Sequence, residues 1–151
     1  MAFSISLPAT AFVPADGGFI EEANNIVGVN FAASGTPEAY SHPFKLPSAY
    51  GAGTITLSIH HYTPSNASGT VVFNAIIRAL DGNADRAFPS AQTATHTRVG
   101  GATAIEIETI TFSSAQIDGA VAGDLVQLQI SRNAGTVSGN AVVIAVELSE
   151  A

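Results

Sequence analysis

Apolar and polar residues alternate along most of this chain with the two-residue period of a β-strand that buries one face. Residues 54–61 place three apolar side chains and His61 on one face, and Thr, Ser and His60 on the other. Residues 126–131 repeat the alternation with Val, Leu and Ile against Gln, Gln and Ser. Each segment therefore predicts a strand with one face in a core.

Strand-like segments of this kind follow one another along the chain, and no segment has the 3.6-residue apolar period of a helix. Besides the two above, they are residues 4–8, 24–35, 38–47, 69–80, 93–99, 102–112 and 138–150. Turn-forming residues separate them at spacings of roughly 8 to 15 residues. This pattern predicts an all-β protein, an antiparallel β-sandwich or jelly roll of about eight to ten strands, as one domain over residues 21–151.

Residues 1–20 contain two prolines and the pair Gly17-Gly18, and they are interpreted as an extended N-terminal arm or as the first strand. An apolar arm has little surface of its own to pack against, so it gains most by lying on a partner protein. The residues expected to make that contact are Phe3, Ile5, Leu7, Phe12 and Val13. If the same residues form the first strand instead, they belong to the core of the sandwich.

The alternation in residues 126–131 places the next residue, Arg132, on the apolar side of its strand. A buried guanidinium is tolerated only when it is paired, because its desolvation costs several kcal/mol. Candidate partners are Asp124, Asp118 or backbone carbonyls near the C-terminus, within one subunit or across a subunit contact.

The composition excludes several classes of function. Charged residues make up 11% of the chain, against about 25% in an ordinary domain, and the net charge is −7 with Lys45 as the single lysine. So few cations argue against binding to nucleic acids or to anionic membranes. The absence of cysteine excludes disulfides and zinc–thiolate sites. The N-terminus lacks a basic region and is interrupted by prolines, so we expect a soluble chain that is not exported by the standard route.

The histidines and carboxylates do not have the spacing of a catalytic or metal site. His60 and His61 are adjacent on a strand and point to opposite faces, so they cannot hold one metal ion. Glu106 and Glu108 share one face of a strand, which we interpret as its solvated face, with Ile105 and Ile107 on the opposite one. We therefore predict no catalytic residue, no metal and no cofactor.

One loop has part of a calcium-binding pattern. Asp81 to Asp85 supply side-chain oxygens at alternate positions. The sixth and twelfth positions of that loop are Arg86 and Gln92, where a calcium loop has glycine and glutamate. An ordinary turn-rich loop is the preferred interpretation, and calcium binding stays open.

The second half of the chain resembles structural proteins of tailed bacteriophages. The resemblance extends over residues 44–148 and rests on Lys45-Leu46-Pro47, on the strands that open at Gly53 and Gly69, and on the string from Gly123 to Arg132, which has the sequence GDLVQLQISR. It implies a jelly roll that forms homotrimers. Specifically, it implies a capsid decoration (cement) protein of the virion, made in the host cytoplasm, that binds the major capsid protein and stabilises the shell against DNA pressure. The apolar N-terminal residues would then contact the shell.

Two other classes of function stay open. The first is a trimeric receptor-binding or carbohydrate-binding head module of a phage fibre or tail protein. Exposed aromatic residues would favour it, but the chain has no Trp and has only Tyr40, Tyr50 and Tyr62 as tyrosines. The second is a small cupin-type enzyme, which requires a histidine and glutamate metal cluster. We rank the enzyme last.

Overall fold

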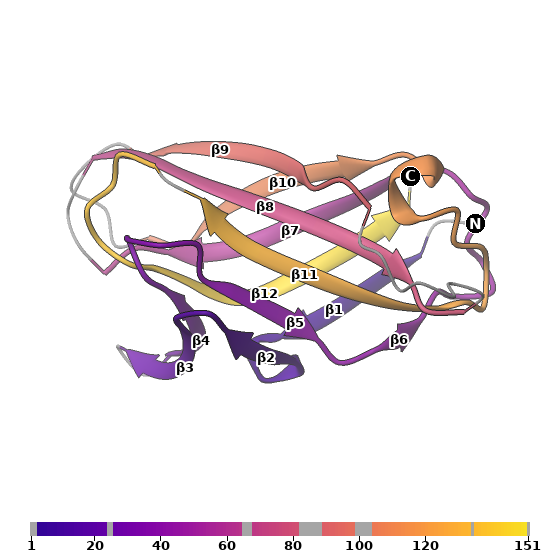
Figure 1. The fold of residues 1–151 in the computed structure, drawn as a ribbon, viewed down its shortest axis with the longest axis horizontal. Helices are drawn as coiled ribbons and strands as arrows, with labels where there is room; N and C mark the ends of the chain where they lie inside the picture. Colours follow the sequence, from indigo (N-terminus) through magenta and orange to yellow (C-terminus); the bar gives the residue numbers. More distant parts are fainter. Residues whose placement is uncertain are drawn as a thin grey trace.

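The computed structural model describes residues 3–23, 26–64, 68–81, 89–98, 104–133 and 135–150. Over these residues the chain forms twelve strands and two short 3-10 helices, η1 (Ala9–Ala11) and η2 (Ser114–Ile117). The strands make two six-stranded antiparallel sheets that pack face to face (Figure 1). The predicted all-β sandwich is confirmed. Neither of these helices is long enough to span a membrane.

The first sheet, called the β7 sheet here, has its last strand near its centre. β12 pairs with β7 on one side and, on the other, with β4 and then β1 along its length. In spatial order the sheet contains β10 (Glu106–Phe112), β7 (Ile55–Tyr62), β12 (Ala141–Glu150), β4 (Ile26–Phe31) and β3 (Gly18–Ala23), with β1 (Ser4–Pro8) beside β12.

The second sheet, called the β8 sheet, lies in front of the first in Figure 1. Its central strand β11 pairs with β8 on one side and with β5 and then β6 on the other. In spatial order it contains β2 (Phe12–Ala15), β5 (Glu38–Ser41), β11 (Leu125–Asn133), β8 (Gly69–Ala79) and β9 (Gln92–Arg98), with β6 (Phe44–Lys45) beside β11.

Every second residue of the central strands points into the space between the sheets and forms the core. The inward residues from β7, β8, β11 and β12 that are almost completely buried are Ile55, Leu57, Ile59, Val71, Phe73, Ile77, Val126, Leu128, Ile130, Val146 and Leu148. The outward residues of β8 are only half-buried. The alternation in the sequence therefore predicted the inner face correctly, and burial of the apolar core stabilises the sandwich.

The N-terminal residues belong to the sandwich itself. β1 pairs with β12 from Ser4 to Pro8, and β2 pairs with β5. Phe3, Leu7 and Phe12 are buried in the core, and Ile5 packs against it. The structure thus corrects the arm prediction in favour of its alternative, the first strand. The physical reason is that β12 offers an unpaired edge beside β4, and β1 satisfies the backbone hydrogen bonds there.

Candidate functional site

Polar side chains gather between the two sheets at one edge of the sandwich. β9 of the β8 sheet and β10 of the β7 sheet both lie at this edge (Figure 1). Their inward side chains, together with one from β7, form a group that we call the inter-sheet cluster: His61, His96, Arg98, Glu106 and Glu108. At this edge the core therefore ends in charged and imidazole groups.

The orientation of β10 is the reverse of the one expected. Glu106 and Glu108 point inward, and the apolar Ile105 and Ile107 are 50% and 54% exposed. The interpretation of the glutamates as a solvated face was wrong. The reason lies in β9, because Arg98 is buried on the inner side and needs a carboxylate there.

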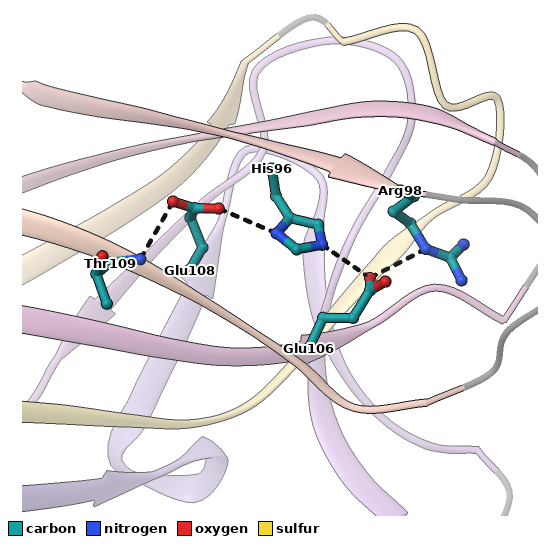
Figure 2. A network of polar contacts seen from close by, with 5 residues as sticks. All are labelled: His96, Arg98, Glu106, Glu108 and Thr109. Atoms are coloured by element: carbon teal, nitrogen blue, oxygen red, sulfur yellow. Dashed lines mark hydrogen bonds and ion pairs between the residues drawn. The ribbon is translucent and has the colours of Figure 1, made fainter.

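Four members of the inter-sheet cluster are joined by polar contacts in one network: His96, Arg98, Glu106 and Glu108 (Figure 2). The Nδ1 atom of His96 lies 3.0 Å from Glu108 Oε2, and its Nε2 atom lies 3.3 Å from Glu106 Oε2. The same Glu106 oxygen accepts a hydrogen bond of 3.0 Å from Arg98 Nε. The other oxygen of Glu108 accepts from the backbone N–H of Thr109 at 3.2 Å. The His96 ring is thus held between two carboxylates.

His61 completes the cluster from β7. Its side chain is fully buried, and its ring packs edge-on against Phe73 and His96 with centroid distances of 4.9 and 5.0 Å. Neither ring nitrogen has a hydrogen-bond partner in the part of the chain that the structure describes. Burial, together with the nearby His96 and Arg98, lowers the pKa of His61 to about 3, so the ring is neutral at pH 7.

Three of these side chains are close enough to share an ion. One ring nitrogen from each of His61 and His96 and one carboxylate oxygen of Glu106 all lie within 4.8 Å of one another. The sequence correctly predicted that His60 and His61 point to opposite faces, since His60 points outward on β7. It did not predict the group of His61, His96 and Glu106, because these residues meet only when the two sheets pack.

A second polar arrangement lies on the outer face of the β8 sheet. The register places Tyr40, Gln129 and Ile76 side by side across β5, β11 and β8, and places Gln127 beside Arg78. Their chain neighbours, such as Leu128 and Ile130, point inward and are buried. We call the polar members of this surface the β8-sheet face: Glu38, Tyr40, Arg78, Gln127 and Gln129.

Hydrogen bonds hold the side chains of the β8-sheet face in place. The Tyr40 hydroxyl donates to Glu38 Oε2 at 2.5 Å and accepts from Gln129 Nε2 at 3.3 Å. Arg78 Nη2 donates to Gln127 Oε1 at 2.7 Å, and Gln127 Nε2 donates to the carbonyl of Ser41 at 3.1 Å. Burial and the bond to Glu38 raise the pKa of Tyr40 to about 12. The face thus presents a tyrosine ring and several oriented polar groups.

Arg132 is buried as its position in the alternation predicted, with 1% of its surface exposed. Its partners are backbone carbonyls, because Nη1 donates to those of Phe31 and Gly139 and Nη2 to that of Val137. The expected ion pair within the chain is therefore wrong, and the alternative of backbone carbonyls is right. Asp124 directly precedes β11, eight residues or about 26 Å from Arg132, and Asp118 directly follows η2, earlier in the segment that leads to β11.

Asp124 and Asp81 both accept hydrogen bonds from backbone N–H groups near the start of β11. Asp124 Oδ2 accepts from the backbone N–H of Val121 at 2.9 Å, which stabilises the turn before β11. Asp81 Oδ2 accepts from the N–H of Leu125 at 2.6 Å. The rest of the Asp81–Asp85 loop lies outside the described residues, and the prediction about calcium binding falls on those residues.

A scan against protein-family models and a search of curated proteins both give no match to this sequence. Solved structures do share its fold. An isomalto-dextranase from Arthrobacter globiformis T6, complexed with panose, matches 96% of this chain at 15% identity and a TM-score of 0.64. This chain spans only 23% of that enzyme.

Two carbohydrate-binding modules match over nearly their whole length. The first is a CBM36 domain of a multidomain xylanase from the hindgut metagenome of Trinervitermes trinervoides, with 9% identity, 97% and 96% coverage and a TM-score of 0.58. The second is a module from Cellvibrio mixtus lichenase 5A in complex with cellotriose, with 14% identity, 97% coverage of both chains and a TM-score of 0.55. At these identities the likeness concerns the fold.

Proposed function

We propose that this protein is a non-catalytic carbohydrate-binding module, and that it binds an oligosaccharide on the β8-sheet face. The observation that carries the proposal is the hydrogen-bonded arrangement of Tyr40, Glu38 and Gln129 on that face. The shared fold of the carbohydrate-binding modules supports it. It develops the carbohydrate-binding alternative, the first of the two other function classes that the sequence left open.

The chemistry of the β8-sheet face suits a sugar. A tyrosine ring offers a rigid surface that is apolar in its body and polar at its tip, and it loses little conformational entropy on binding. Gln127 and Arg78 offer amide and guanidinium groups, and Glu38 offers a carboxylate. Gln129 is 7% exposed and orients the Tyr40 hydroxyl from below. These groups are already oriented by bonds to one another, which lowers the entropic cost of binding. The preferred ligand is therefore neutral and rich in hydroxyl groups.

The proposal is tested by electrophoresis in gels that contain soluble xylan, laminarin or dextran, in which binding retards the protein. We expect retardation by at least one polysaccharide and its loss in Tyr40→Ala. The matched control is Thr111→Ala, which removes an exposed side chain from β10 in the opposite sheet. Unchanged migration of the native protein in every gel would contradict the proposal, and so would equal retardation of Tyr40→Ala.

A structural role in a capsid is the second candidate. Apolar side chains on the β3–β4 hairpin favour it, because Phe19, Ile20 and Val27 are 47%, 42% and 45% exposed at the edge of the β7 sheet. A homotrimer that sits on the virion surface and binds the major capsid protein would cover such a hairpin. Light scattering after size exclusion tests the trimer, since it would have three times the 15.3 kDa mass of the chain. A monomer at every concentration would count against it.

A further inference from the structure

We propose that His61, His96 and Glu106 form a binding site for a divalent transition-metal ion such as zinc, which links the two sheets at the β9–β10 edge. The three ligand atoms lie within 4.8 Å of one another and come from β7, β9 and β10. The site is separate from the β8-sheet face and does not depend on carbohydrate binding.

The strongest observation is the state of His61. Its ring is fully buried, and neither nitrogen has a hydrogen-bond partner among the described residues. A buried polar group without a partner costs about 1–3 kcal/mol, and native proteins rarely leave one. A bound metal ion would satisfy one of these two ring nitrogens without a further group from the protein. The neutral imidazole is also the form that coordinates metals.

The orientation of His96 matches that of a histidine prepared for an ion. Its Nδ1 atom lies 3.0 Å from Glu108 Oε2, which leaves Nε2 directed toward Glu106 (Figure 2). Metal-binding histidines commonly donate their second ring N–H to a carboxylate, which fixes the ring and raises its basicity. We therefore assign Glu108 as a positioning residue and His96 Nε2 as the ligand atom.

The charge of the cluster favours a cation. Glu106 and Glu108 bring two negative charges against one guanidinium, that of Arg98. Arg98 contacts Glu106 through Oε2, and a carboxylate has two oxygens with about four acceptor positions. Glu106 can thus keep Arg98 as an outer partner while it binds the ion. The positive charge of Arg98 also offsets part of the negative charge of the two carboxylates, which favours one bound cation over two.

The donor set selects the class of metal. Two imidazole nitrogens and one carboxylate suit zinc and its neighbours in the first transition row, whereas calcium and magnesium prefer oxygen ligands. Zinc bonds of about 2.0–2.2 Å would draw the ligand atoms closer together, and the flexible Glu106 side chain can follow. His96 and Glu106 keep 20% and 18% of their side-chain surface exposed, so solvent can reach the ion.

The test is calorimetric titration of ZnCl2 into chelator-treated full-length protein, with Co²⁺ absorption as a report on the ligands. We expect one ion per chain, a tetrahedral Co²⁺ spectrum, and a higher melting temperature with zinc. His61→Phe and Glu106→Gln should abolish binding, and Glu108→Gln should weaken it by about 10-fold or more. The matched control is His60→Ala, which removes the neighbouring histidine on the outer face and should leave binding unchanged.

The outcomes separate the site from adventitious binding. Absence of zinc binding to the native protein would overturn the proposal. Loss of binding in His60→Ala with retention in His61→Phe would also overturn it, because the ion would then lie on the outer face. Displacement of Co²⁺ by calcium would contradict the donor argument. If His61→Phe does not fold, as judged by its circular dichroism, Glu106→Gln at the exposed side of the cluster decides the matter.

Discussion

At the scale of single residues, Arg132 shows how this core accommodates a charge. Its guanidinium is fully buried at the end of β11 and donates to three backbone carbonyls from two separate segments of the chain. Burial lowers the pKa of this group, yet the charged form remains bonded. The side chain therefore joins the end of β4 to the segment between β11 and β12.

Arg132→Ala is expected to destabilise the protein by about 3 kcal/mol or more, because each buried carbonyl left without a donor costs about 1–3 kcal/mol. Urea unfolding followed by circular dichroism measures the change. Lys45→Ala removes an exposed positive charge from β6 and should change the free energy of unfolding by less than about 0.5 kcal/mol. Equal stability of the two variants would show that Arg132 is not bonded as described.

Tyr40 gives a prediction for alkaline pH. Its folded pKa of about 12 lies above the value of about 10 of an unfolded tyrosine. The stability that this proton contributes is complete below pH 10 and is lost as the pH rises from 10 to about 12. The difference in tyrosinate absorbance between native protein and Tyr40→Phe should therefore titrate near 12, and Glu38→Gln should lower that value. A midpoint near 10 in the native protein would contradict the contact with Glu38.

The sequence predicted the burial of Arg132 and gave backbone carbonyls as one class of partner, but it did not indicate which carbonyls accept. Burial follows from the parity of residues 126–132 alone. The carbonyls of Phe31, Val137 and Gly139 are brought to the guanidinium by the end of β4 and by the segment between β11 and β12, whose positions depend on the packed sheets. Backbone carbonyls are also present at every residue, so no side-chain pattern marks the ones that will accept.

At the scale of elements, β10 shows the limit of amphipathic patterns. An alternating strand has two equivalent orientations, and the usual rule buries the isoleucines and exposes the glutamates. Here β9 presents Arg98 and His96 to the inner side, and these groups require carboxylates opposite them. The residues that decide the orientation lie on β9. The pattern of β10 alone therefore predicted the wrong inner face and gave no indication of the inter-sheet cluster.

Two isoleucines of β10 test this orientation. Ile110→Thr replaces a side chain that is 3% exposed and should destabilise the protein by about 1–3 kcal/mol. Ile107→Thr makes the same change at a side chain that is 54% exposed, and should alter stability by less than about 0.5 kcal/mol. Thermal unfolding of both variants measures the difference. A larger loss for Ile107→Thr would mean that β10 has the opposite orientation.

At the scale of the whole molecule, the N-terminal residues complete both sheets. β1 pairs with the central strand β12 of one sheet, and β2 extends the other sheet beside β5. Phe3 also packs edge-on against Tyr50 with the ring centroids 5.9 Å apart. The prolines that suggested an arm are accommodated in short strands at the margins, where a missing N–H is tolerated.

The apolar residues of this segment should therefore differ in their effect on stability. Phe3→Ala and Leu7→Ala remove buried side chains and should each cost about 2–5 kcal/mol. Val13→Ala, in the same segment but 52% exposed, should cost less than about 0.5 kcal/mol. Chemical denaturation of the three variants decides the matter. Little change in all three would restore the interpretation of a detached arm.

The proposed binding of carbohydrate to the outer face of the β8 sheet can be tested residue by residue by nuclear magnetic resonance. Cellotriose and panose would be titrated into ¹⁵N-labelled protein while the backbone amide shifts are followed. We expect saturable shifts centred on Tyr40, Gln127 and Gln129, with residues of β7 and β10 unaffected. Shifts centred on another surface, or no shifts with either sugar, would contradict it.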